Sequence, residues 1–285
     1  MEKKYYFDVN KEVEGCIKWI REWFQNNALG YNAIIEMDGY RDSTIVASLC
    51  VKALGRKNVI GVIMPEKKRN LNGADVICES LGIKSVVCPI KWAKRFLRHS
   101  VKKGMGEDLR ILAEINLPQR IKMSMLFAVA ESNKAIVVNT INLSRDYVGD
   151  MTLFGNDAGF IAPIRNFTIT ELRLIGRNLG LRHEWIENVK SVNNLGEEDV
   201  FCYKYNELDS IIRNLDTTSE IYADRKESIL NKHDATEPYR KILNINAYEW
   251  NPYKIIEPVK PPVSDNNGYD ADDHYGGWKG LNDTY

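Results

Sequence analysis

A short polar segment, residues 37–43, combines residue types that bind the phosphate groups of a nucleotide in many proteins. The segment follows an apolar run and holds a glycine turn, with Gly39, Asp42 and Ser43 leading into the next predicted helix. Backbone N–H groups at the start of a helix point outward, where they can bind phosphate oxygens. The segment is therefore a candidate pyrophosphate-binding loop.

The elements around this loop predict an α/β fold, a parallel sheet with helices on both faces. Near-continuous apolar runs predict buried strands at 31–37, 59–64, 85–88 and 135–138. Helical periodicity predicts helices at 11–28, 42–55, 72–81, 107–114 and 118–132. Alternating strands and helices are typical of a parallel sheet covered on both sides. Because ligands bind at the carboxyl ends of such strands, the turns 37–43 and 139–146 are expected to form the site.

The chain divides into a domain and a tail. Helical periodicity returns at 169–179 and 206–213, and the composition changes at Pro258, beyond which Asp, Asn, Gly and Tyr become frequent. We assign residues 1–257 to one domain and residues 258–285 to an acidic and aromatic C-terminal tail. The tail is interpreted as a disordered terminus, with recognition of a protein partner as the alternative.

Charge and hydropathy argue against several classes of protein. The 39 Lys and Arg residues balance 39 Asp and Glu residues, so no bulk charge attracts nucleic acid or an anionic membrane. No apolar run approaches the roughly 20 residues of a membrane-spanning helix, and the N-terminus lacks the apolar stretch of a signal peptide. A cytoplasmic protein is expected. The five cysteines include no C-x-x-C pair, which predicts buried free thiols in place of zinc or disulfides.

One segment departs from this charge balance. Residues 91–103 carry six Lys and Arg residues, with Trp92 and Phe96 between them. A basic patch with interleaved aromatic residues is typical of a surface that binds nucleic acid or another anion. The favoured interpretation here is a solvated helix face, with Trp92 and Phe96 packed into the domain.

Several blocks of the sequence resemble the ammonia-dependent NAD synthetases, in the same order along the chain. Residues 38–43 read Asp-Gly-Tyr-Arg-Asp-Ser where that family has Ser-Gly-Gly-x-Asp-Ser. Residues 116–123 resemble its Asn-x-x-x-Arg helix, and 139–144 resemble the loop after its next strand. Residues 149–163 resemble its flexible loop, and 205–209 a late helix start. The resemblance extends over about residues 10–250 and implies the Rossmann-like fold of the adenine nucleotide alpha hydrolase (ATP pyrophosphatase) superfamily.

The resemblance also implies an activity, that of an AMP-forming carbon–nitrogen ligase. The family, usually a homodimer, adenylates nicotinic acid adenine dinucleotide with ATP and Mg²⁺, and ammonia then displaces AMP to form NAD. The ATP-binding positions of the family correspond to Asp38, Gly39, Tyr40, Asp42, Ser43 and Thr140. Asn116 and Arg120 occupy substrate-binding positions, and Asp42 is the metal ligand if Mg²⁺ is bound.

The catalytic loops depart from the family pattern at several positions. Asp38 replaces a Ser, and a carboxylate beside a triphosphate costs about 4 kcal/mol at about 4 Å and an effective dielectric of about 20. Tyr40 replaces a Gly, so its Cβ is expected to hinder close backbone approach and positive φ angles. Arg145 replaces a Mg²⁺-binding Glu, and a guanidinium repels a metal ion. The remaining departures are Asn156 and Phe160 for two acids of the flexible loop, and a late loop shortened to 190–195.

Two classes of function remain open. The first is an ammonia-dependent NAD synthetase, or a divergent AMP-forming amide ligase in which Arg145 binds phosphate by its charge. The second is a non-catalytic paralogue that needs no cofactor and binds a nucleotide or a protein partner. Changes concentrated in the catalytic loops favour the second class over the use of Arg145 as a phosphate clamp.

A homodimer is expected in either class. The predicted helices at 107–132 carry more apolar surface than one helix buries against its own sheet, and stable interfaces between copies are of this apolar kind. The residues that motivate the prediction are Ile121, Met123, Met125, Leu126 and Phe127.

Overall fold

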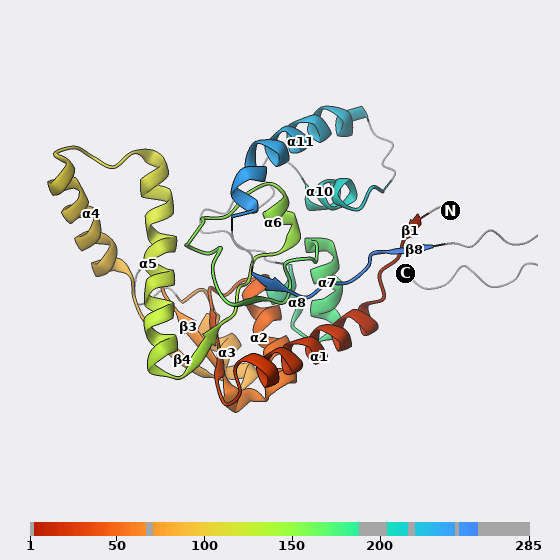
Figure 1. The fold of residues 1–285 in the computed structure, drawn as a ribbon, viewed down its shortest axis with the longest axis horizontal. Helices are drawn as coiled ribbons and strands as arrows, with labels where there is room; N and C mark the ends of the chain where they lie inside the picture. The colour runs from red at the N-terminus through yellow and green to blue at the C-terminus, as the bar shows by residue number, and fades with distance from the viewer. Residues whose placement is uncertain (1–2, 67–70, 188–203, 216–219, 243–244, 256–285) are drawn as a thin grey trace, which may run out of the picture.

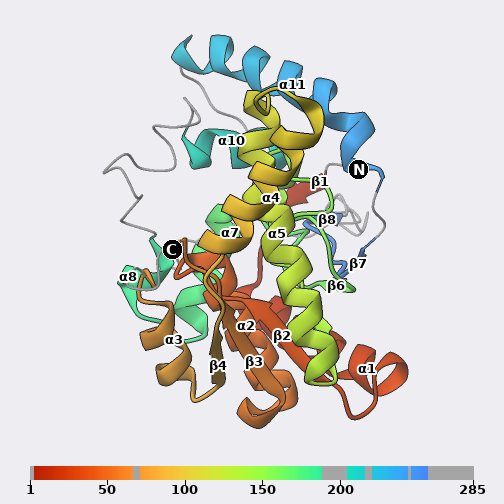
Figure 2. The same cartoon turned by 90° about the vertical axis from the view of Figure 1, so that its left-hand side faces the viewer.

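A four-stranded parallel sheet forms the centre of the fold (Figures 1 and 2). In the computed structural model its strands are β2 (Asn32–Glu36), β3 (Val59–Ile63), β4 (Lys84–Val87) and β5 (Ala135–Val137). They lie in the order β4-β3-β2-β5, and every pair is parallel. The predicted α/β fold with a parallel sheet is confirmed.

The structure describes residues 3–66, 71–187, 204–215, 220–242 and 245–255. The tail 258–285, the shortened loop 190–195 and Cys202 lie outside the described residues. The roles inferred for the tail and for this loop therefore stay predictions from the sequence.

Helices cover both faces of the sheet because the strands alternate their buried side chains between two cores. Ala33 and Ile35 face a core shared with α1 (Val9–Asn27), α2 (Arg41–Leu54) and α3 (Ala74–Leu81). Ile34 and Val62 face a second core, which α5 (Ile111–Ser132) covers. The amphipathic helix α4 (Lys91–Met105) packs on α5 at the edge of the molecule (Figure 1).

Two predictions about this edge are wrong. One helix, α5, replaces the two predicted at 107–114 and 118–132, and Pro118 lies inside it. Pro118 removes a single backbone donor, while the helix beyond it buries Ile121 and Leu126 against the sheet. Trp92 and Phe96 do not pack into the domain, since they are 68% and 78% exposed.

The residues that motivated the predicted dimer also lie elsewhere than expected. Ile121, Met123 and Leu126 are buried within one chain, and Met125 and Phe127 are partly buried against the same core. The exposed apolar side chains of α5 are instead Ile111, Leu112 and Ile115 near its start. The reason is that the sequence pattern does not indicate which face of a helix lies on the sheet.

The other described elements lie outside the central sheet, and most of them belong to the second half of the chain. The remaining strands pair as β1 (Lys3–Tyr5) with β8 (Tyr253–Ile255) and β6 (Ile161–Ala162) with β7 (Asn246–Ala247). In the part of the chain that the structure describes, the remaining helical segments are η1 (Arg56–Asn58), α6 (Leu143–Tyr147), α7 (Ile169–Asn178), α8 (His183–Ile186), α10 (Tyr205–Ile212) and α11 (Glu220–Arg240). Helix α11 is not predicted from the sequence, because its polar and charged residues form no clear apolar stripe.

The cysteines in the described part of the chain are free thiols, as predicted. Cys16, Cys50 and Cys78 are buried, and Cys88 is partly exposed. Burial raises the pKa of Cys50 to about 12 and that of Cys78 to about 11, which keeps both protonated at neutral pH. Among the helices that the structure describes, none has the length and apolar character to span a bilayer.

A buried ion pair joins the N-terminal strand to the later helices. Glu171, which is 1% exposed, accepts hydrogen bonds from Nε and Nη2 of Arg213, each at 2.8 Å. The same carboxylate accepts the backbone N–H of Thr168 at 2.7 Å, which completes a capping box at the start of α7. The hydroxyl of Tyr5 in β1 donates to it at 3.0 Å. Strand β1, helix α7 and the end of α10 therefore meet at one carboxylate.

Removing this carboxylate should destabilise the fold strongly. In Glu171→Ala the guanidinium of Arg213 stays buried without its counter-ion, so the free energy of unfolding should fall by about 3–5 kcal/mol. Glu22→Ala, in the exposed Lys18–Glu22 pair, is the control and should cost at most about 0.5 kcal/mol. Urea denaturation measures both, and equal losses would contradict the role of Glu171.

Candidate nucleotide site

The loop 37–43 connects β2 to α2 and depends on one glycine. Gly39 has a φ of +87°, and a Cβ atom there would lie 2.3 Å from the backbone oxygen of Asn72. Only glycine fits this position without moving the neighbouring chain. Tyr40 has a φ of −102° and a ψ of 170°, which is ordinary extended backbone. The expected conflict between the Cβ of Tyr40 and a positive φ therefore does not arise.

The carboxylate of Asp38 occupies the position where this loop would be expected to bind an anion. Its Oδ1 accepts the backbone N–H of Tyr40 at 3.0 Å and the hydroxyl of Ser43 at 2.6 Å. Tyr40 is the N-cap residue of α2, so these donors lie at the positive end of the helix. Donors of this kind bind phosphate in nucleotide-binding loops. Here the loop binds an anion that belongs to its own chain.

Asp42 is held by an arginine and an asparagine. Arg41, only 1% exposed, donates from Nε to Oδ1 of Asp42 at 3.0 Å. Asn142 donates from Nδ2 to the other oxygen, Oδ2, at 2.8 Å. Mg²⁺ needs carboxylate oxygens that are free to turn toward it, and a neighbouring guanidinium repels it. The residues present therefore do not fit a magnesium ion at Asp42.

The hydrogen bond between Asp42 and Asn142 joins the two turns predicted to form the site. Asn142 also caps α6, where its Oδ1 accepts the backbone N–H of Arg145 at 3.0 Å. Thr140 is partly buried in the same turn after β5. The guanidinium of Arg145 forms an ion pair with Asp150, with 2.9 Å between Nε and Oδ2. Part of its positive charge is thus compensated within the chain.

The two positions assigned to the substrate lie on α5 and hold the segment after α6. Oδ1 of Asn116 accepts the hydroxyl of Thr152 at 2.8 Å, and Nε of Arg120 donates to the backbone oxygen of Leu153 at 3.3 Å. Asn156 lies in this segment, and its Oδ1 accepts the backbone N–H of Thr152 at 2.7 Å. The uncharged side chain of Asn156 thus takes part in the folding of the segment itself.

Phe160 and Phe127 extend the apolar side of this region. Phe160, at the other acidic position of the family, is 47% exposed, and its ring centroid lies 6.1 Å from that of Phe127 on α5. An aromatic ring cannot replace the charge or the metal-binding oxygens of a carboxylate. This end of the segment therefore supplies apolar surface in place of an acid.

A further ion pair, which is not predicted from the sequence, lies beside the loop. Lys122 on α5 lies 2.8 Å from Glu36 at the end of β2, and both side chains are mostly buried. Burial disfavours the charge of Lys122, but the carboxylates of Glu36 and Asp38 outweigh it and raise the pKa of the lysine. Lys122 is therefore a fixed cation at the carboxyl end of the sheet.

The charged groups at this end of the sheet are mostly matched within the chain. Glu36 has Lys122, Asp42 has Arg41, and Arg145 has Asp150. The described residues contain no group of three or more His, Cys, Asp or Glu side chains that could hold a metal ion. The role of Arg41 could have been predicted from the sequence. It stands at the start of a helix that reads as buried, and a buried charge needs a partner.

Comparison with known proteins gives a consistent assignment. The family model for NAD synthase matches residues 12–254. The NH(3)-dependent NAD(+) synthetase of Methanocaldococcus jannaschii is 33% identical over 215 residues, which cover 70% of this chain and 79% of that protein.

Solved structures agree on the fold. The NMN synthetase of Francisella tularensis superposes with a TM-score of 0.72 at 22% identity, covering 84% of this chain and 98% of that one. The NH3-dependent NAD synthetase of Campylobacter jejuni superposes with a TM-score of 0.65, also at 22% identity, covering 84% and 99%. Together with the family match over most of its length, these findings show that the chain belongs to the NAD synthase family.

Proposed function

We propose that this chain is a non-catalytic member of the NAD synthase family, which binds a nucleotide but does not turn over ATP with Mg²⁺. The observation that carries the proposal is the carboxylate of Asp38 on the N–H of Tyr40 and the hydroxyl of Ser43. A triphosphate would have to displace this internal anion and would meet its negative charge. The engaged carboxylate of Asp42 supports the same conclusion for the metal.

Arg145 does not restore a phosphate site in this proposal. Its ion pair with Asp150 compensates the charge that a phosphate clamp would use. We therefore favour the non-catalytic function over a ligase that uses Arg145 in place of Mg²⁺.

The proposed ligand is a dinucleotide such as nicotinic acid adenine dinucleotide. Asn116 and Arg120 keep the residue types of the family's substrate positions, and both lie beside the segment 150–160. Lys122 lies on the same helix, but its charge is compensated by Glu36, so Asn116 and Arg120 carry the proposed recognition. A cytoplasmic location is part of this proposal, because its proposed ligand belongs to intracellular NAD synthesis.

The loop should bind ATP weakly in the natural sequence and better once Asp38 is removed. Calorimetry of the wild type with ATP, with and without Mg²⁺, should give no micromolar affinity. Asp38→Ser should strengthen ATP binding about tenfold, which corresponds to about 1.4 kcal/mol of relieved repulsion. The combined variant Asp38→Ser, Tyr40→Gly, Arg145→Glu should add dependence on Mg²⁺. Asp75→Ser removes an exposed carboxylate at the start of α3 and is the matched control.

Three outcomes would contradict this account. Micromolar, Mg²⁺-dependent binding by the wild type would mean that Asp38 and Arg41 move aside for the nucleotide. Weaker binding of ATP by the combined variant would mean that Arg145 is a phosphate ligand after all. If neither variant changes the affinity, residues 37–43 are not a nucleotide site.

A homodimer is also part of the proposal. Ile111, Leu112 and Ile115 are 80%, 69% and 63% exposed at the start of α5, and burying such a cluster against a second copy is favourable. Light scattering at low micromolar concentration should give twice the chain mass. Ile111→Glu with Ile115→Glu should shift the protein to the monomer, whereas Val76→Glu, an exposed apolar position on α3, should not. A monomeric wild type would refute the dimer.

A further inference from the structure

The segment 150–160 lies against the end of β5 and is attached there at several points. The side-chain amide of Asn139, just after β5, donates to the backbone oxygens of Asn156 and Ala158 at 3.0 and 2.9 Å. Gly159 has a φ of +133°, and a Cβ atom there would lie 3.1 Å from a backbone oxygen at the end of β5. A residue without a side chain allows this close approach of the two backbones.

The middle of the segment is a tight turn with a strained residue. The N–H of Phe154 donates to the backbone oxygen of Asp157 at 3.2 Å. The backbone oxygen of Thr152 accepts the N–H groups of Gly155 and Asp157, at 2.8 and 3.2 Å. Phe154 has a φ of +59°, a left-handed conformation that is unfavourable for a bulky side chain. Strained backbone persists only where the surrounding structure holds it, so contacts outside the turn are needed to keep this form.

Arg165 provides such a contact. It lies in the turn between β6 and α7, and its Nη1 donates to Oδ1 of Asp157 at 2.6 Å. Its Nη2 donates to Oδ1 of Asp146, on α6, at 2.7 Å. All three side chains are mostly buried. One guanidinium therefore joins the segment to α6 and to the turn before α7.

The carboxylate of Asp157 depends on this arginine. Asp157 is fully buried, and its second oxygen, Oδ2, accepts no hydrogen bond from the described residues. A buried carboxylate without a counter-ion is unfavourable, because its charge has lost its contact with water. Without Arg165, the side chain of Asp157 would gain free energy by turning toward solvent, and the turn at Phe154 would open with it.

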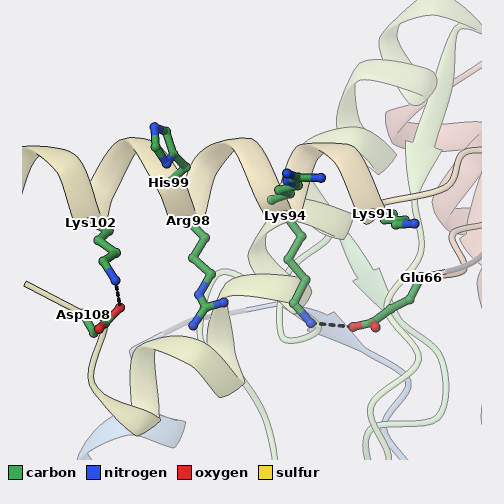
Figure 3. Close-up of a pocket in the computed structure, with 8 residues that line it drawn as sticks. Glu66, Lys91, Lys94, Arg98, His99, Lys102 and Asp108 are labelled. Atoms are coloured by element: carbon green, nitrogen blue, oxygen red, sulfur yellow. Dashed lines mark hydrogen bonds and ion pairs between the residues drawn. The ribbon is translucent and has the colours of Figure 1, made fainter.

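An exposed ion pair of the same length has no comparable role. Lys102 and Asp108 also lie 2.6 Å apart, where both line a groove along α4 (Figure 3). Their side chains are 53% and 68% exposed, so water solvates both charges when the pair separates. The burial of Asp157 and Arg165, and not the distance between them, makes their pair a constraint on the backbone.

We propose that Arg165 is a positioning residue, which fixes the segment 150–160 beside Asn116 and Arg120 before any ligand binds. Both of those side chains already form hydrogen bonds with the segment. A ligand that binds against an ordered segment does not have to supply the free energy of ordering it. The use of this segment by a dinucleotide rests on the proposed function, whereas the fixing of the segment by Arg165 does not.

Hydrogen exchange of the full-length chain without ligand tests the positioning directly. Arg165→Met removes the guanidinium but keeps an unbranched side chain, and the backbone amides of 152–160 should exchange at least about tenfold faster. Asp157→Ala should have the same effect while Arg165 keeps its partner Asp146, so no buried charge is left unpaired. Amides of β2 and β3 should change by less than about twofold, because the opening is local. Asp108→Ala is the matched control and should leave the segment unchanged.

Calorimetric titration with nicotinic acid adenine dinucleotide measures what the fixed segment contributes to binding. Asp157→Ala should weaken the affinity about tenfold, because binding must then order the segment. Asp108→Ala should bind as the wild type does. If the wild type does not bind this dinucleotide, the proposed function is wrong, and the exchange of 152–160 alone decides whether Arg165 positions the segment.

Three results would overturn the inference. The first is unchanged exchange of 152–160 in both Arg165→Met and Asp157→Ala. The second is equal acceleration in the segment and in the central sheet, which would make Arg165 a general stabilising residue. The third is faster exchange in Asp157→Ala with the dinucleotide affinity of a binding wild type, which would show that the segment is no part of the site.

Discussion

The hydrogen bonds from Tyr40 and Ser43 to the carboxylate of Asp38 are the interaction on which the rest of this site depends. A helix that starts at the carboxyl end of a parallel strand offers unpaired N–H groups, and these groups attract an anion. In this chain the anion is built in, two residues before the helix cap. Because Asp38 accepts these hydrogen bonds, the N–H of Tyr40 and the hydroxyl of Ser43 have a partner without a bound phosphate.

The neighbouring charges follow the same principle. Arg41 is buried beside Asp42, Lys122 beside Glu36, and Arg145 lies against Asp150. A buried ion requires a partner, because removing a charge from water is costly unless another charge or several hydrogen bonds compensate it. The site therefore reaches near-neutrality without a ligand. In the proposed non-catalytic function, the charged groups that could bind ATP and Mg²⁺ are already paired within the chain.

The sequence predicted the fold well because its signal is local and repetitive. Each buried strand is a run of apolar residues, and the turns at 37–43 and 139–146 had to meet, since both follow strands of one parallel sheet. The failures concern the directions of side chains. Trp92, Phe96 and Ile111 are exposed because of how α4 and α5 are turned against their neighbours, and the pattern of a single sequence does not show that orientation. The partners of Arg41 and Asp38 are likewise visible only in three dimensions. The sequence shows only that Asp38 departs from the family pattern and that Arg41 is a charged residue in the loop.

The most direct test of the central claim is an assay of AMP formation with nicotinic acid adenine dinucleotide, ATP, Mg²⁺ and ammonia. The non-catalytic account predicts no AMP above the rate without protein, even at saturating concentrations of all four reactants. Sustained, Mg²⁺-dependent release of AMP over many turnovers would contradict it, and would require Asp38 and Arg41 to leave the positions that they hold here.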